Sequence, residues 1–197
     1  MLRAGDVIEN PVTGERVVVI EGSEDTGGAY LVGELTVTPG GQVVGEHIHD
    51  HLDETFEVLS GRISVRLDGR DFELGEGERA FVPKGSAHDW WNDSGANAVV
   101  RVRVEPAGRF EEMLTTVFAL ARAGRTNAKG MPGPLQLALF AREFESTLRL
   151  TKPPRIVQRI LFGILAPIAR MRGYSGTFPY GEPGRVELTA RQTRAAS

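Results

Sequence analysis

The chain has 197 residues, of which 41% are hydrophobic, and its formal net charge at pH 7 is -3. This length and composition predict one compact domain, or one domain with an appendage, with enough apolar side chains for a buried core. Cysteine is absent, which excludes disulfide bonds and thiolate metal sites. A bound metal ion would therefore need His, Asp or Glu ligands.

The ends and the apolar runs of the sequence suggest where the protein works. Residues 1–6 contain no apolar run before the first acid and are not typical of a signal peptide. The longest apolar stretch, residues 160–169, is too short to cross a bilayer. The acidic net charge argues against nucleic acid as a partner, because phosphate binding needs a basic face. We therefore expect a soluble, cytoplasmic protein.

The charged residues divide unevenly about Pro106. Residues 1–106 carry 9 basic and 20 acidic side chains, whereas residues 107–197 carry 14 basic and 6 acidic ones. Such a change of composition predicts two segments. We expect a domain over residues 1–106 and an extension over residues 107–197.

The first segment is predicted to be rich in strands. Apolar and polar residues alternate with a period of two, which is typical of half-buried antiparallel strands, in the segments 31–37, 63–67, 72–74 and 100–104. Turn residues separate these runs, and Asp68-Gly69 is a good candidate for a hairpin turn. Many short strands at this spacing predict a mainly β fold, either a sandwich or a barrel.

The second segment changes to a helical period. Apolar residues from Phe110 onward mark one face of a helix that ends at Gly124, and Pro134 opens a second helix that reaches Leu148. A third helix follows Pro154 and runs to about residue 168. The extension is therefore predicted to be α-helical, with an extended tail after it.

Residues with metal-binding side chains are concentrated in two places. His47 and His49 are two apart, so on a strand both imidazoles would face the same side. Glu54 follows a short polar bend and begins the next strand, and His88 follows a turn that contains Pro83 and Gly85. We expect His47, His49, Glu54 and His88 to form one metal site.

These residues belong to two longer patterns that resemble the two motifs of the cupin family. Gly41, His47, His49, Glu54 and Gly61 match the first motif in type and spacing. The second motif is matched by Gly77, Pro83, Gly85, His88 and Asn92. The resemblance covers roughly residues 30–105 and implies a double-stranded β-helix, the jelly-roll barrel of cupins. It also implies one divalent metal ion in the barrel mouth, held by the four residues named above.

Other residues near the motifs are candidates for the walls of the site or for the core. Phe56 and Val58 alternate with the same face as Glu54 and are expected to wall the site, while Glu57 is expected to face away. Trp90 shares the face of His88 and is a candidate for either the pocket or the core. His51 could replace His49 as a ligand, hydrogen-bond to a ligand, or lie on the surface.

The ligand set leaves the metal and the chemistry open. Imidazoles with one carboxylate suit Fe(II), which we favour, and also Mn(II), Ni(II), Co(II) or Zn(II). The first hypothesis is a dioxygenase-type oxidoreductase that acts on a small enolisable or catechol-like substrate. The second is a redox-neutral isomerase, cyclase or lyase that uses the metal as a Lewis acid, and the third is a barrel that binds a small molecule without catalysis.

The helical extension allows three interpretations. Its positive charge would favour packing on the acidic barrel or across a homodimer. Its third helix could instead form a lid over the barrel mouth, with Phe162, Ile164 and Leu165 facing an apolar substrate. A third possibility is that residues 155–172, whose apolar run is flanked by Arg155, Arg159, Arg170 and Arg172, lie on an anionic membrane surface.

Overall fold

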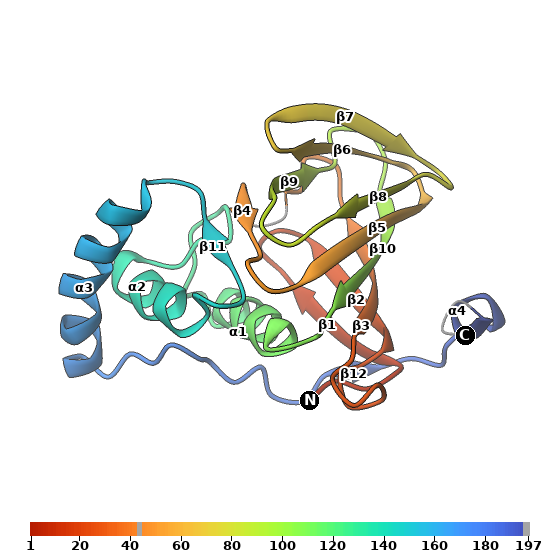
Figure 1. Ribbon diagram of the computed structural model, residues 1–197. Coiled ribbons are helices and arrows are strands. Elements are labelled where there is room, and N and C mark those ends of the chain that lie inside the picture. Colours follow the sequence, from red (N-terminus) through yellow and green to blue (C-terminus); the bar gives the residue numbers. More distant parts are fainter. Residues whose placement is uncertain (43–44, 195–197) are drawn as a thin grey trace.

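Two antiparallel β-sheets face each other in the computed structural model, which describes residues 1–42 and 45–194 (Figure 1). The larger sheet has the spatial order β12 (Gly184–Arg185), β1 (Asp6–Asn10), β2 (Glu15–Glu21), β3 (Leu31–Val37), β10 (Ala98–Glu105), β5 (Asp53–Ser60) and β8 (Arg79–Val82). The smaller sheet has the order β11 (Arg149–Leu150), β4 (His47–Ile48), β9 (Ala87–Trp91), β6 (Arg62–Leu67) and β7 (Arg70–Gly75). The helices are α1 (Phe110–Arg122), α2 (Pro134–Glu143), α3 (Arg155–Met171) and α4 (Ala190–Arg194). The predicted mainly β fold with C-terminal helices is confirmed.

The period-two pattern of the strands builds the core between the sheets. Val100 of β10 lies between Leu35 of β3 and Val58 of β5 in the strand register, and all three side chains are buried. Ile63 and Val65 of β6 are fully buried in the same cluster. Because side chains on one face of a sheet alternate with those on the other, the apolar members of each strand meet in one layer.

The hairpin between β6 and β7 forms at the dipeptide predicted from the sequence. Asp68 and Gly69 have φ angles of 47° and 78°, and Leu67 pairs with Arg70 across the turn. Two successive positive φ angles suit the twist of the flanking strands, and Asp-Gly is among the sequences that adopt them most readily. The expected turn is therefore confirmed.

The C-terminal extension is joined to the barrel at several points. It supplies an edge strand to each sheet, because β12 pairs with β1 and β11 pairs with β4. Phe118 of α1 is 1% exposed and belongs to the same apolar cluster as the inward-facing strand residues. The division at residue 106 remains a prediction, but within the described chain the two segments share a core.

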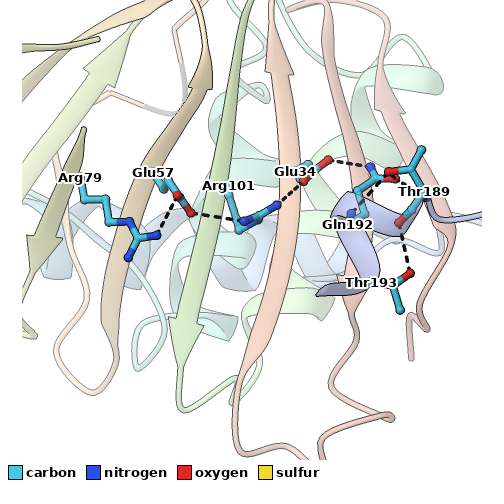
Figure 2. A network of polar contacts seen from close by, with 7 residues as sticks. All are labelled: Glu34, Glu57, Arg79, Arg101, Thr189, Gln192 and Thr193. Carbon is cyan, nitrogen blue, oxygen red and sulfur yellow. Dashed lines mark hydrogen bonds and ion pairs between the residues drawn. The ribbon is translucent and has the colours of Figure 1, made fainter. Parts of the chain in front are cut away.

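A chain of charged contacts crosses the outer face of the larger sheet (Figure 2). Glu57 of β5 accepts hydrogen bonds from Arg79 and Arg101, and Arg101 also pairs with Glu34 at 2.7 Å. Gln192 of α4 donates to the other oxygen of Glu34 at 2.6 Å and so attaches the end of the described chain to this face. Glu57 therefore faces away from the barrel interior, as its position on the strand predicted.

No helix in the described part of the chain is both long enough and apolar enough to cross a membrane.

Gly61, which belongs to the first motif, provides a test of the barrel corner between β5 and β6. Its φ is +79°, and an added Cβ would lie 2.8 Å from the carbonyl oxygen of Asn97 and 3.1 Å from Cα of Ala98. We expect Gly61→Ala to lower the free energy of unfolding by about 2–4 kcal/mol, because backbone strain adds to a clash with rigid backbone. Urea denaturation followed by circular dichroism measures the change.

The matched control is Gly69→Ala. Gly69 has a similar φ of +78°, but no atom lies within 4 Å of the added Cβ. We therefore expect Gly69→Ala to lower the free energy of unfolding by only about 1 kcal/mol, from backbone strain alone. Equal losses for the two variants would contradict the argument from close approach.

Candidate metal centre

Four side chains predicted to bind one metal ion lie together inside the barrel. One potential ligand atom from each of His47, His49, Glu54 and His88 lies within 4.8 Å of all the others. The four residues are between 0% and 5% exposed. The structure therefore brings together groups that are 41 positions apart in the sequence.

Both sheets contribute to this cluster. His47 of β4 and His88 of β9 are cross-strand partners in the smaller sheet, and His49 follows β4 directly. Glu54 comes from β5 of the larger sheet, where it pairs with Val82 and Val104. The carboxylate thus reaches the imidazoles across the barrel interior, so the cluster depends on the closure of the two sheets.

Backbone carbonyl groups orient the three imidazoles. Nδ1 of His47 lies 2.7 Å from the oxygen of Gly45, and Nδ1 of His88 lies 3.2 Å from that of Ser86. Nδ1 of His49 is hydrogen-bonded to the carbonyl oxygen of Thr147. A neutral imidazole that donates from Nδ1 carries its lone pair on Nε2, which is the tautomer that a metal ligand requires.

The distances between the inward-facing atoms fit one shared cation. Nε2 of His47 lies 3.1 Å from Nε2 of His49, and Oε2 of Glu54 lies 2.8 Å from Nε2 of His88 and 3.5 Å from Nε2 of His49. Ligands about 2.1 Å from one ion and at right angles to each other are separated by about 3 Å. The Nε2 lone pairs of His47 and His49 face each other in a buried site. This arrangement is unfavourable unless a proton or a cation lies between them. The residues present therefore fit a divalent metal ion.

The electrostatics of the cluster favour an anionic Glu54 beside a neutral His47. Burial, followed by the neighbouring His88 and His49, lowers the pKa of His47 to about 3. Burial alone would raise the pKa of Glu54, but His49 and His88 outweigh it and hold that pKa well below its usual range. Burial alone would lower the pKa of His49, but Glu54 and the Thr147 carbonyl outweigh it, so this pKa is raised. At neutral pH, His47 is therefore free to ligate and Glu54 is charged.

The helical extension covers the cluster. The ring of Phe110, at the start of α1, lies 5.7 Å from the ring of His49 between centroids. Leu150 of β11 pairs with His47 of β4, and Arg149 forms an ion pair with Asp50 at 2.9 Å. Together with the Thr147 carbonyl, these contacts explain why the imidazoles are shielded from solvent.

The cover differs from the lid that the sequence suggested. Ile164 of α3 is 60% exposed, and Phe162 lines a separate cavity rather than contacting the imidazoles. The interpretation of α3 as a lid over the metal site is therefore wrong for these side chains. Physically, α2 lies between α3 and the barrel, so the cover comes from α1 and the segment that precedes α3 (Figure 1).

Of the other candidates, three lie in the barrel interior and one does not. Phe56 and Val58 are at most 1% exposed, and the Phe56 ring centroid is 6.2 Å from that of His88. Trp90 is 3% exposed and packs against Phe56, with ring centroids 5.7 Å apart. His51 is exposed at the surface and is not a member of the cluster, which agrees with the surface alternative.

A cavity of about 1000 Å³ lies between the barrel and the helical extension. Its walls include apolar residues of α1, α2 and α3, such as Leu114, Phe140 and Phe162. The four clustered residues do not line it, but Gly45, which anchors His47, does. The cavity is thus a neighbour of the metal site, with a size and polarity suited to a small organic molecule.

Sequence reasoning missed the groups that the extension contributes to the site. The carbonyl of Thr147 orients His49, but a backbone oxygen is present at every residue and leaves no signal in a sequence. Phe110 was expected only as part of the apolar face of a helix. The ring contact with His49 depends on where that helix packs, which residue spacing does not encode.

Comparison with known proteins agrees with this architecture. Residues 33–104 match the family model described as Cupin domain. This part of the chain is therefore a cupin domain. Over 99 residues, half of this chain, the sequence is 28% identical to quercetin 2,3-dioxygenase of Bacillus subtilis, of which the match covers 28%. It is also 36% identical over 66 residues to a mannose-1-phosphate guanylyltransferase of Escherichia coli, of which the match covers 14%.

These matches cover only part of each protein. The chain spans less than half the length of these curated relatives. Among solved structures, a predicted oxalate decarboxylase from Thermotoga maritima aligns with a TM-score of 0.47 and 18% identity, over 54% of this chain and 98% of its own.

The ligand set of the cupin domain can be tested by elemental analysis of protein purified without a histidine tag. We expect the double variant His47→Ala/His49→Ala to lose stoichiometric metal, because half of the donor atoms are removed. His51→Ala is the matched control and should keep the wild-type metal content, since His51 is exposed. Unchanged metal in the double variant would place the site elsewhere.

The covering role of the extension can be tested by the rate at which a chelator removes metal. We expect Phe110→Ala to bind metal in the wild-type amount but to lose it to a chelator at least about 10-fold faster, because the ring shields His49. Phe72→Ala, at a 36% exposed position on β7, should leave the rate unchanged. Equal rates for Phe110→Ala and wild type would contradict the covering role.

Proposed function

We propose that this protein is a metal-dependent oxidoreductase of the dioxygenase type, acting on a small enolisable or catechol-like substrate. The observation that carries the proposal is the buried convergence of three imidazoles and one carboxylate. Fe(II) is the favoured ion, and Mn(II), Ni(II), Co(II) and Zn(II) share the same ligand preferences. A redox-active ion held there would supply the electron chemistry with dioxygen that the protein side chains lack.

The residues of this chain have three tasks in such a reaction. The backbone carbonyls of Gly45, Ser86 and Thr147 hold the imidazoles in the ligating orientation. Glu54 remains ionised and reduces the local positive charge. With one carboxylate, a divalent ion would have a net local charge near +1, which favours an anionic substrate such as an enolate.

Exclusion of water is the third task. Phe56 and Phe110 place apolar rings beside His88 and His49, and a dry site strengthens every electrostatic interaction inside it. The apolar cavity beside Gly45 offers room for the organic part of the substrate. The similarity of half of this chain to a quercetin 2,3-dioxygenase supports the proposal at the level of reaction type.

The test compares turnover with and without dioxygen. Protein reconstituted with Fe(II) is assayed on a panel of enolisable carbonyl compounds and catechols, with oxygen uptake and product formation measured together. We expect stoichiometric oxygen consumption and no turnover under anaerobic conditions. Glu54→Gln should lower kcat/KM by about 100-fold or more, because it removes a ligand charge, while the exposed His51→Gln should be unchanged.

Activity that persists without oxygen would overturn the dioxygenase proposal. It would favour the redox-neutral alternative, in which the metal polarises a carbonyl and the product is an isomer or an elimination product.

A further inference from the structure

Helix α3 is amphipathic in the opposite sense to an ordinary surface helix. Its buried residues are mostly small or polar: Gln158, Phe162, Ala166 and Ala169. Its large aliphatic residues are exposed, with the exposed fractions Ile156 64%, Val157 45%, Ile160 59%, Leu161 43% and Ile164 60%. A surface helix normally turns its aliphatic face to the core, so packing within this chain does not account for the aliphatic side chains of α3.

The exposed aliphatic residues form one continuous stripe. At about 100° per residue, Ile156, Ile160, Ile164, Val157 and Leu161 fall within an arc of about 140°. The opposite side, with Ala166 and Ala169, packs against Leu139 of α2. The stripe therefore points directly away from the body of the protein.

The position of α3 in the fold leaves this stripe accessible. In Figure 1 the helix lies at the outer edge of the molecule, and α2 separates it from the barrel. Within the described chain, no other segment covers the outward side, as the exposed fractions show. The stripe is thus accessible for binding without a rearrangement of the protein.

The charges on α3 and at its C-terminal end have one sign. Residues 155–172 contain four arginines and no acidic residue. Arg155 lies 3.5 Å from Glu145, but in the described structure no ion pair engages the guanidinium groups of Arg159, Arg170 or Arg172. Arg159 and Arg170 project about 40–60° outside one edge of the aliphatic arc. Arginines beside an apolar stripe can bury their methylene stems while the charged ends reach anionic groups.

We propose that the outward face of α3 binds the surface of a membrane rich in anionic lipids. The aliphatic stripe would lie among the acyl chains near the headgroups, and Arg159, Arg170 and Arg172 would contact lipid phosphates. This combination of a strongly apolar face, flanking arginines and no acid is the pattern of helices that lie in the plane of the interface. The inference does not depend on the proposed reaction.

A second copy of the chain fits this surface less well. If two α3 helices packed face to face, eight arginines would come together without an acid from either helix, and like charges oppose such contact. Reciprocal packing of α3 on the acidic barrel of another copy is the remaining arrangement between copies, and the sedimentation experiment below distinguishes it from lipid binding. A lipid surface supplies both the apolar medium and the negative charge.

Vesicle flotation tests the proposal with the whole 197-residue chain. Vesicles of phosphatidylcholine alone are compared with vesicles in which about a third of the lipid is phosphatidylglycerol. We expect the wild type to float with the anionic vesicles and not with the neutral ones. Because surface electrostatics are screened by salt, binding should fall as ionic strength rises.

Three variants separate the contribution of the aliphatic stripe to membrane binding from that of the arginines. Ile160→Gln/Ile164→Gln should weaken binding to anionic vesicles by about 10-fold or more, because aliphatic burial is lost. Arg159→Gln/Arg170→Gln should weaken it by about 30-fold at low salt and flatten the salt dependence. Phe81→Gln is the matched control, since Phe81 of β8 is also 60% exposed but lies on the barrel, and it should bind as the wild type does.

The variants alter exposed side chains, so their melting curves by circular dichroism should match that of the wild type. Absence of wild-type flotation with anionic vesicles, or unchanged flotation of Ile160→Gln/Ile164→Gln, would overturn the proposal. Sedimentation velocity without lipid shows whether the wild type and the double variant are monomers or dimers. A wild-type dimer that the same double variant converts to monomer, without any vesicle binding, would assign the surface to contact between copies instead.

Discussion

The burial of three imidazoles and one carboxylate at a single point between the sheets is the constraint on which the rest of the structure depends. A buried polar group without a partner costs free energy, so each of these side chains must be hydrogen-bonded or bound to an ion. The three Nδ1 atoms are satisfied by backbone carbonyls. The Nε2 atoms of His88 and His49 then lie beside Glu54, and that of His47 lies beside Nε2 of His49. The barrel thus holds its ligands ready for a cation at the place where water is excluded.

The helical extension completes this arrangement and adds a second property. Its inner elements close the site, through Phe110, the Thr147 carbonyl and the pairing of β11 with β4. Its outermost helix, α3, presents aliphatic side chains to the outside. Arg155, Arg159 and Phe162 of α3 also line the cavity beside the metal site, so one helix connects the outward surface with the space next to the ligands.

Much of the fold could be predicted because local pattern and tertiary structure agree in the barrel. The alternation around Val58 and Val100, the Asp68-Gly69 turn and the helical periods after Phe110 each correspond to an observed element. The site could be predicted because its motif spacing places His47 and His88 on adjoining strands and His49 directly after the first of them. The position of the extension could not be predicted, because an apolar stripe such as that of α3 is compatible with packing against the barrel and with exposure to solvent.

The sequence by itself determined the donor set, the strand pattern and the helices, since residue type and period are local properties. Only the tertiary structure decided which side of each helix meets the barrel. Docking depends on the sum of many contacts between segments distant in the chain. For the same reason, the cover over His49 comes from Phe110 and Thr147 rather than from Ile164. The large residues of α3 face outward because the small surface formed by Ala166 and Ala169 fits closely against α2.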